Sequence, residues 1–416
     1  MTSLRVTIIA CMAVTAVNAA TASDLSDALL QNSSGYSLRA QPQYSALGIR
    51  FANWLLMPTL KSGLYYDSNL YKAKGRKESS VVGLFAPALT LHSDVSRHSF
   101  QFGLSGLRKH AFSNENASTL SGRASANANV EILSDFALDL GASIETKQFE
   151  LGAADASSDA QHGVRREAYV ASARISKVFN RLRFIGGASV THHNYHDVSA
   201  ESGGVIDQDY RDGTRFSILG KMNYAFSPGL SAFASAEYNA RNWKAAGVDN
   251  RDSQGIEFLT GLEVDKRGNF HGVAGVGYLR QDYDLGTRGD ISTYSVNVDL
   301  QWMPSPLLVV NFDGRRSVEE SSLAGHTSKL TSKAEVSLDY EFLRNLIISP
   351  VISYKRENYS GVDRRDDTFR ARLETKHLIN RNLKFGAYYD FETLKSTAAE
   401  NSYSRHLIGI NAKVEY

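Results

Sequence analysis

The chain has 416 residues, of which 42% are hydrophobic and 22% are charged, and its formal net charge at pH 7 is +2. This near-neutral balance gives no electrostatic basis for binding nucleic acid. The single cysteine, Cys11, excludes a disulfide framework and a thiolate metal site.

The first 23 residues have the layout of a cleavable signal peptide. Arg5 supplies a short positive region, a mostly apolar run follows, and small residues at Ala19, Ala22 and Ser23 offer cleavage sites. The apolar run is too short to cross a bilayer as a helix. We expect cleavage close to Asp24, so that the mature chain contains no cysteine. Removal of Arg5 lowers the formal net charge from +2 to +1.

Residues 24–50 form a polar segment, which we expect to lie in the periplasm. This segment is far too short for a folded plug of the kind found in siderophore receptors. The sequence therefore argues against an energised transporter with a plug domain.

From residue 51 to the C-terminus, apolar and polar residues alternate in repeated segments. Clear apolar phases are Phe216, Ile218, Gly220, Met222, Tyr224, Phe226; Leu330, Ala334, Val336, Leu338, Tyr340, Phe342; and Leu383, Phe385, Ala387, Tyr389, Phe391. Strict alternation predicts strands, and segments of about ten residues or more have the length of a tilted transmembrane strand. The low mean hydropathy of −0.29 is compatible with transmembrane strands, because a barrel strand exposes only every second residue to lipid.

The connections between these segments alternate between short and long. The short ones are His92–Arg97, Ser134–Asp135, Asn180–Arg181, Ser227–Gly229, Lys266–Gly268, Pro304–Pro306, Arg344–Asn345 and Asn380–Arg381. The long ones are Asp67–Ser80, Ser113–Ser118, Glu150–Val164, His196–Gly213, Lys244–Ser253, Asp284–Asp290, Ser317–Thr327, Gly361–Asp367 and Lys395–Ser402. Outer-membrane barrels have tight periplasmic turns and longer external loops. We therefore predict an all-β fold: a closed antiparallel transmembrane β-barrel of about 18 strands, over residues 51–416, with both termini periplasmic.

The last segment alternates to a terminal aromatic residue. Ile408, Ile410, Ala412, Val414 and Tyr416 form its apolar phase. This ending resembles the C-terminal signal that the barrel-assembly machinery reads, although Phe is commoner than Tyr at the last position. We assign the predicted assembly signal to Val414 and Tyr416.

Motifs near the start of the barrel resemble those of a known family. They are the run Ala40–Arg50, which contains Gln-Pro-Gln-Tyr, a proline at Pro58, and Tyr66-Asp-Ser-Asn-Leu-Tyr71. The chain resembles the putative β-barrel porin 2 family, in which a charged version of the first run leads to a corner with a second Asp where this chain has Ser68. The resemblance implies an outer-membrane channel, which in some members is similar to barrels paired with periplasmic polysaccharide-export proteins. It implies no catalytic residues.

Charged residues on the polar phase of the late strands are the best functional candidates. The predicted lumen-lining residues are Lys333, Glu335, Asp339, Arg370, Arg372, Glu374, Lys376, Lys384, Asp390 and Glu392. Such side chains can pair across neighbouring strands, and paired wall charges also set the electric field in a pore.

Sites for a metal or for catalysis have weaker support. His192, His193 and His196 lie at the end of one strand, but no carboxylate on the same face accompanies them. Asp207 and Asp209 lie in an acidic loop that lacks the spacing of an EF-hand. No nucleophile elbow accompanies the scattered histidines. We therefore expect no metal, no cofactor and no enzymatic activity.

The sequence leads to a passive outer-membrane conduit of a Gram-negative bacterium. Two cargoes compete: a secreted exopolysaccharide delivered by a periplasmic export partner, or small hydrophilic solutes through a general diffusion porin. A structural or adhesive barrel and a barrel enzyme are the alternatives of another class. The expected partners are outer-membrane lipid, lipopolysaccharide and the barrel-assembly machinery, and no nucleic acid.

Overall fold

The computed structural model describes residues 41–75, 77–95, 97–152, 159–245, 247, 250–266, 269–286, 289–321 and 328–416. The predicted signal peptide and most of the predicted periplasmic segment lie outside these residues. No helix in the described part of the chain is long and apolar enough to cross a bilayer.

The described chain consists almost entirely of long strands. In chain order the elements are η1 (Pro42–Tyr44), β1 (Ile49–Phe51), β2 (Trp54–Asp67), β3 (Ser80–Ser93), β4 (His98–Ala111), η2 (Glu115–Ala117), β5 (Thr119–Leu133), β6 (Phe136–Gln148), β7 (Arg165–Phe179), β8 (Leu182–Tyr195), β9 (Val198–Ser199), β10 (Val205–Ile206), η3 (Asp209–Arg211), β11 (Gly213–Ser227), β12 (Leu230–Trp243), β13 (Ser253–Lys266), β14 (Phe270–Tyr283), β15 (Ile291–Ser305), β16 (Leu308–Glu320), β17 (Ser328–Leu343), β18 (Leu346–Tyr359), β19 (Arg365–Leu378), β20 (Leu383–Ser396), η6 (Ala399–Asn401) and β21 (Tyr403–Glu415).

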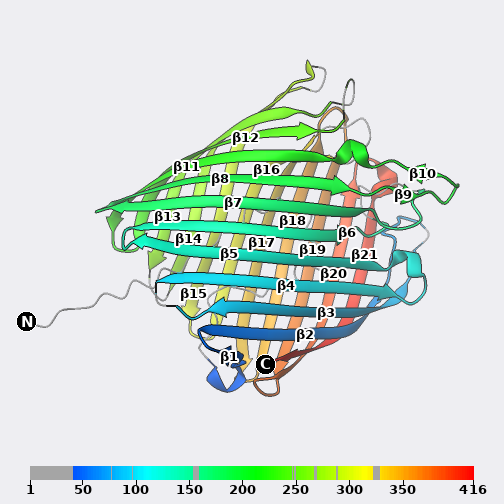
Figure 1. The fold of residues 1–416 in the computed structure, drawn as a ribbon. Helices are drawn as coiled ribbons and strands as arrows, with labels where there is room; N and C mark the ends of the chain where they lie inside the picture. The colour runs from blue at the N-terminus through cyan, green and yellow to red at the C-terminus, as the bar shows by residue number, and fades with distance from the viewer. Residues whose placement is uncertain are drawn as a thin grey trace, which may run out of the picture. The chain divides into compact units, whose positions relative to one another are not determined.

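Eighteen of these strands form a closed antiparallel barrel (Figure 1). Each wall strand, β2–β8 and β11–β21, pairs with the next wall strand along the chain, and β21 pairs with β2 to close the ring. Closure matters because it leaves no row of unpaired backbone groups exposed to lipid. The predicted fold class and strand count are confirmed.

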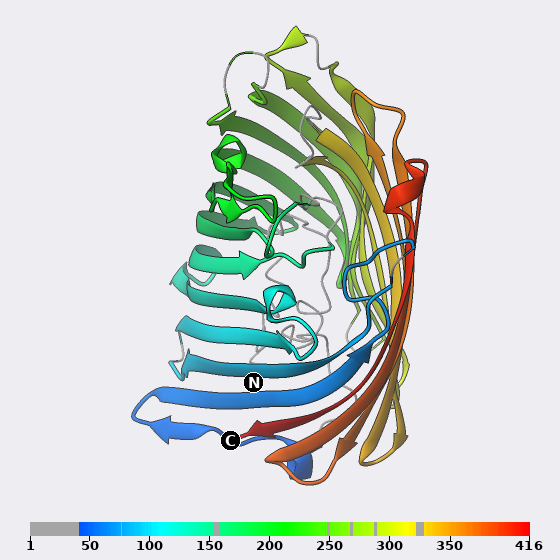
Figure 2. The ribbon, with the colours of Figure 1, turned by 90° about the vertical axis from the view of Figure 1, so that its right-hand side faces the viewer.

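The wall strands are joined by turns at one end of the barrel and by longer loops at the other. The turns are residues 94–97, 134–135, 180–181, 228–229, 267–269, 306–307, 344–345 and 379–382. The loops are residues 68–79, 112–118, 149–164, 196–212, 244–252, 284–290, 321–327, 360–364 and 397–402. Figure 2 faces the long-loop end and shows connections, among them η2 and η3, lying over the opening of the ring.

The tight turns use residues that accept the left-handed backbone region. Asn180, with φ of 54°, turns the chain between β7 and β8, and Gly229, with φ of 78°, does so between β11 and β12. Asn and Gly are the residues that adopt this conformation at least cost. Two-residue turns of this kind keep consecutive strands in antiparallel register.

Candidate functional site

The two faces of the barrel wall differ in chemistry. Large apolar side chains are exposed on the outer face, among them Phe102, Leu104, Ile144, Ile218, Phe258, Val276, Tyr294, Ile352 and Ile410. Successive side chains of a strand point to opposite faces, so the polar residues between them line the interior. The interior of the barrel is therefore polar and charged.

The ten predicted lumen-lining residues all occupy inner-face positions. They lie on β17 (Lys333, Glu335, Asp339), β19 (Arg370, Arg372, Glu374, Lys376) and β20 (Lys384, Asp390, Glu392). Their role in transport stays a prediction.

The structure brings several of these residues together in ion pairs. Arg370 donates Nε and Nη2 to the two oxygens of Asp390 at 2.6–3.1 Å. Arg372 bonds Glu374 at 2.9 Å and also lies 3.9 Å from Asp390. Asp390 is only 1% exposed, so these charges are held by one another across β19 and β20.

The other members have different partners. Lys333 pairs with Glu335 at 3.0 Å, and Glu392 accepts the Tyr403 hydroxyl at 2.6 Å. The Ser349 hydroxyl bonds Asp339, and Lys384 pairs with Glu415. Among the described residues Lys376 has no ion-pair partner.

A different part of the inner wall is open to water. Asp299 on β15 and Asp313 on β16 are cross-strand partners, and both are exposed. Arg315, two residues further along β16, is exposed as well. Because these side chains are on the inner face of a closed barrel, their exposure requires solvent inside it.

An ionic cluster ties loop 149–164 to the wall at the long-loop end. We call it the mouth cluster: Asp67, Lys72, Lys109, Glu150 and Arg405. The Glu150 carboxylate lies 3.2 Å from the Lys72 ammonium and 3.1 Å from both the Lys109 ammonium and the Arg405 guanidinium. Arg405 Nε also donates to both oxygens of Asp67, each at 3.0 Å.

Electrostatics in the mouth cluster favour the ionised form of its loop members. Burial alone would raise the pKa of Glu150, but Arg405, Lys109 and Lys72 together hold it well below the ordinary value of 4.5. Burial would likewise lower the pKa of Lys72, yet Glu150 raises it above its ordinary value. Glu150 is therefore a buried anion that three cations stabilise.

The family-like motif at Asp67–Asn69 builds the corner next to this cluster. Asp67 accepts the backbone N–H of Asn69 at 3.0 Å as well as the Arg405 guanidinium. The Asn69 amide donates to the carbonyls of Ala73 at 2.8 Å and Ser404 at 3.0 Å. The motif thus links the loop after β2 to β21, the strand that closes the barrel.

Loops 149–164 and 196–212 share a small apolar core. Its buried members, Ala160, Val164 and Val198, pack against the partly buried side chains Phe149, Leu151, Tyr195 and Ile206. The guanidinium of Arg211, from η3, lies 4.2 Å from the centre of the Tyr195 ring. Two loops at the opening are therefore packed against each other.

Two further contacts join parts of the barrel that are not neighbours in the sheet. Arg241 on β12 donates to the carbonyl of Val318 on β16 at 3.2 Å, although three strands separate β12 from β16 along the wall. Arg251, in the loop after β12, donates to the carbonyl of Ser321 at 2.8 Å. These bonds narrow the path at the long-loop end.

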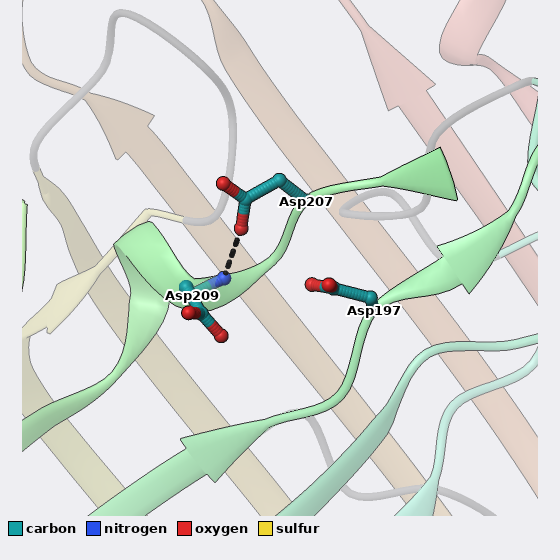
Figure 3. Close-up of side chains that lie close together, drawn as sticks. All are labelled: Asp197, Asp207 and Asp209. Atoms are coloured by element: carbon teal, nitrogen blue, oxygen red, sulfur yellow. Dashed lines mark hydrogen bonds between the residues drawn. The ribbon is translucent and has the colours of Figure 1, made fainter. Parts of the chain in front are cut away.

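Three carboxylates, Asp197, Asp207 and Asp209, have oxygens within 4.8 Å of one another (Figure 3). Asp197 accepts the backbone N–H of Gln208, and Asp207 accepts that of Asp209, both at 2.8 Å. Lys244 pairs with Asp209. These partners give the cluster a role in shaping loop 196–212, and the geometry assigns it no ligand.

The three candidate histidines do not converge. His192 bonds the Thr214 hydroxyl at 2.9 Å, and His196 lies 3.0 Å from Glu167. His193 follows His192 on β8 and so points to the opposite face of the strand, whereas His196 lies just beyond the end of β8.

The mouth cluster is the feature that sequence reasoning missed. The sequence pattern places Glu150 only in a loop, and it gives no reason to single out Lys72, Lys109 or Arg405. The one signal for it was the Asp67–Asn69 motif, whose role in a corner becomes clear only when β2 and β21 are paired.

Comparison with known proteins identifies one matching family. The model of the family described as putative beta-barrel porin 2 matches residues 41–416. No curated protein matches the chain.

Several solved structures have a similar arrangement of strands. A mutant of the ferric enterobactin receptor PfeA from Pseudomonas aeruginosa is 6% identical, with a TM-score of 0.45, covering 86% of this chain and 80% of that one. The outer membrane protein OpdK from Pseudomonas aeruginosa is 11% identical, with a TM-score of 0.41 and coverages of 87% and 99%. A BenF-like porin from Pseudomonas fluorescens is also 11% identical, with a TM-score of 0.43 and the same coverages.

Proposed function

This chain belongs to the putative β-barrel porin 2 family, and we propose that it is a passive channel for small hydrophilic solutes. Membership of a porin family places the barrel in the outer membrane of a Gram-negative bacterium. Passive transport needs an aqueous path whose wall charges tolerate the solute, and no covalent chemistry.

The observation that carries the proposal is the exposure of charged side chains inside the closed wall. Asp299, Asp313 and Arg315 are exposed on the inner face of β15 and β16. An eighteen-strand barrel is wide enough to leave a water-filled lumen unless loops fill it. A barrel with a purely structural role does not need a water-filled interior lined by charged side chains.

The contacts at the long-loop end favour small solutes over a polymer. The mouth cluster, the apolar core of loops 149–164 and 196–212, and the Arg241–Val318 bond all lie where a polymer would have to pass. Export of an exopolysaccharide with a periplasmic partner has no support from the family match. No observation favours an adhesive role or an enzyme.

Planar-bilayer recording of the purified protein tests the channel. We expect discrete open steps whose ion selectivity depends on the inner-wall charges. The Asp299→Asn/Asp313→Asn variant should shift the reversal potential toward anions, because it removes two exposed inner-wall charges without breaking an ion pair. Reversing Arg370 and Arg372 would be a poorer test, since it would leave the carboxylate of Asp390 facing new negative charges.

The matched control is Asp284→Asn/Asp363→Asn, which removes two exposed acidic residues from long loops. It should leave the reversal potential close to that of the wild type. Absence of current both from the wild type and from a variant with Glu150→Gln, which weakens the mouth cluster, would refute the channel.

A further inference from the structure

Three lysines are direct cross-strand neighbours on the inner wall. Lys61 on β2 is the partner of Lys413 on β21, and Lys413 is the partner of Lys384 on β20. We call these residues the lysine row. Like charges directly opposite one another in a sheet are destabilising. A wall built only for stability would not place three ammonium groups side by side.

The carboxylates of the protein only partly neutralise this row. Glu415 serves both Lys384 and Lys413, lying 2.8 Å from the latter. Lys61 has no ion-pair partner among the described residues, and neither has Lys376 on β19. Glu374, the nearest acidic residue on β19, is bonded to Arg372 at 2.9 Å.

An amide donor without an acceptor lies beside the same lysines. Asn411 on β21, two residues before Lys413, has a buried Nδ2 group with no hydrogen-bond partner. A buried donor left unpaired is costly, and in native structures it calls for an explanation such as a bound ion. Its position among ammonium groups points to an acceptor that carries negative charge.

Small residues make room for this amide. The cross-strand row next to the lysines runs from Lys376 through Gly386 and Asn411 to Gly63. A Cβ atom on Gly386 would lie 2.9 Å from Asn411 Nδ2, and one on Gly63 would lie 2.5 Å from the carbonyl oxygen of Ile410. Glycine at both positions lets the Asn411 side chain lie against the wall between Lys376 and Lys61.

We propose that Lys61, Lys376 and Asn411, with the lysine row, bind the oxyanion group of a solute, a carboxylate or a phosphate, on the lumen wall. The inference rests on the proposed channel function, because the solute reaches this wall through the lumen. It adds a substrate class: anionic solutes dwell at the site during passage. The acidic residues beside the site are already bonded to other cations: Glu374 to Arg372, and Glu415 to Lys384 and Lys413.

Calorimetric titration of the detergent-purified barrel tests the site directly. Inorganic phosphate and citrate are titrated separately at constant chloride, and both should show saturable binding. Lys61→Gln/Lys376→Gln should weaken this binding by about tenfold or more, because a charge-assisted hydrogen bond is worth at least the free energy of a tenfold change. Asn411→Ala should weaken it less, and heat-modifiable mobility on gels shows whether each variant has folded.

The matched control removes two inner-wall cations at a distance from the site. Arg174→Gln/Arg315→Gln removes two positive charges from the lumen, as Lys61→Gln/Lys376→Gln does. It should nevertheless leave the affinities for phosphate and citrate within about twofold of the wild type. Equal losses in both double variants would mean general electrostatic attraction and no site. Failure of the wild type to bind either anion would also overturn the proposal.

The two proposals can fail separately. Calorimetry measures binding without any current. A barrel that binds phosphate but gives no current in a bilayer would therefore support the anion site and refute the channel. The reverse outcome is also distinct. If the barrel conducts but citrate does not block the current, or blocks it equally in Lys61→Gln/Lys376→Gln, the channel is supported and the anion site is refuted.

Discussion

Glu150 lies 41 residues from Lys109 and 255 residues from Arg405 in the sequence, yet its carboxylate contacts both cations. No local pattern reports contacts of this kind, because they arise only when distant strands and loops come together in the folded barrel. The ten inner-wall charges were different. Their positions followed from alternation alone, whereas their pairing, such as Arg370 with Asp390, depends on register and could not be predicted.

Removal of the Glu150 charge should release loop 149–164 from the wall. Glu150→Gln leaves Lys72, Lys109 and Arg405 without their shared anion, and breaking one partner of a buried ion pair typically costs about 3–5 kcal/mol. We expect larger or longer open steps in planar bilayers and faster proteolytic cleavage within the loop. Glu115→Gln is the control: Glu115 is exposed and its pair with Arg108 spans 3.9 Å, so the same substitution should change neither measurement. Equal behaviour of the two variants would contradict a role for the cluster in closing the mouth.

Acid should open the mouth in the same way. The pKa of Glu150 is lower in the attached loop than its ordinary value of 4.5, so the attached state binds a proton more weakly than the detached state. Attachment is therefore at full strength above pH 4.5 and weakens as the pH falls through the depressed pKa. Open probability measured from neutral pH downward should stay flat to pH 4.5 and then rise. In Glu150→Gln this rise should be absent, and a rise of equal size in that variant would assign the effect to other groups.

At the scale of elements, the long strands were predictable and the short ones were not. A strand of 13 to 16 residues repeats the apolar–polar alternation many times, which identifies it without knowledge of its neighbours. β1, β9 and β10 have two or three residues, too few for any period to show. Strand ends also shifted: the turn expected at His92–Arg97 begins after Ser93, because His92 pairs with Leu55 and Ser93 with Trp54.

The C-terminal strand is the element whose loss should matter most. Val414 pairs with Leu60 on one side and Leu383 on the other, and Tyr416 donates its backbone N–H to Pro58 at 3.2 Å. Deletion of residues 414–416 should block assembly, since unpaired backbone groups in lipid cost several kcal/mol each. The measurement is the amount of heat-modifiable barrel in outer-membrane fractions.

Two variants separate closure from recognition in this strand. Deletion of Gly361–Asp363 removes three residues from a long loop and should leave barrel levels near normal. Tyr416→Ala keeps the backbone bond to Pro58 but removes the exposed terminal ring, so reduced assembly in this variant would support a recognition signal. Normal levels of barrel after deletion of residues 414–416 would contradict both roles.

For the whole molecule, the alternation of short and long connections was sufficient to predict eighteen strands and closure. It could not show how the loops pack, because the core formed by Val164 and Val198 joins two loops through side chains that resemble ordinary loop residues. Which end faces the cell exterior follows only from the general rule that the short turns of outer-membrane barrels face the periplasm. With an even number of strands, β2 begins and β21 ends on the side of the short turns, so one measurement orients both ends of the barrel.

We predict that the short turns and both ends of the barrel face the periplasm. Cys11 is the only cysteine, so a Cys11→Ser background carries no native thiol and reports only an introduced cysteine. Asp363→Cys, in an exposed loop, should react in intact cells with a polyethylene glycol maleimide too large to enter the barrel. Ser134→Cys, in an exposed turn, should react only after the outer membrane is disrupted. Labelling of Ser134→Cys but not of Asp363→Cys in intact cells would invert the barrel and place the mouth cluster on the periplasmic side, where Glu150 would control exit from the periplasm instead of entry from outside.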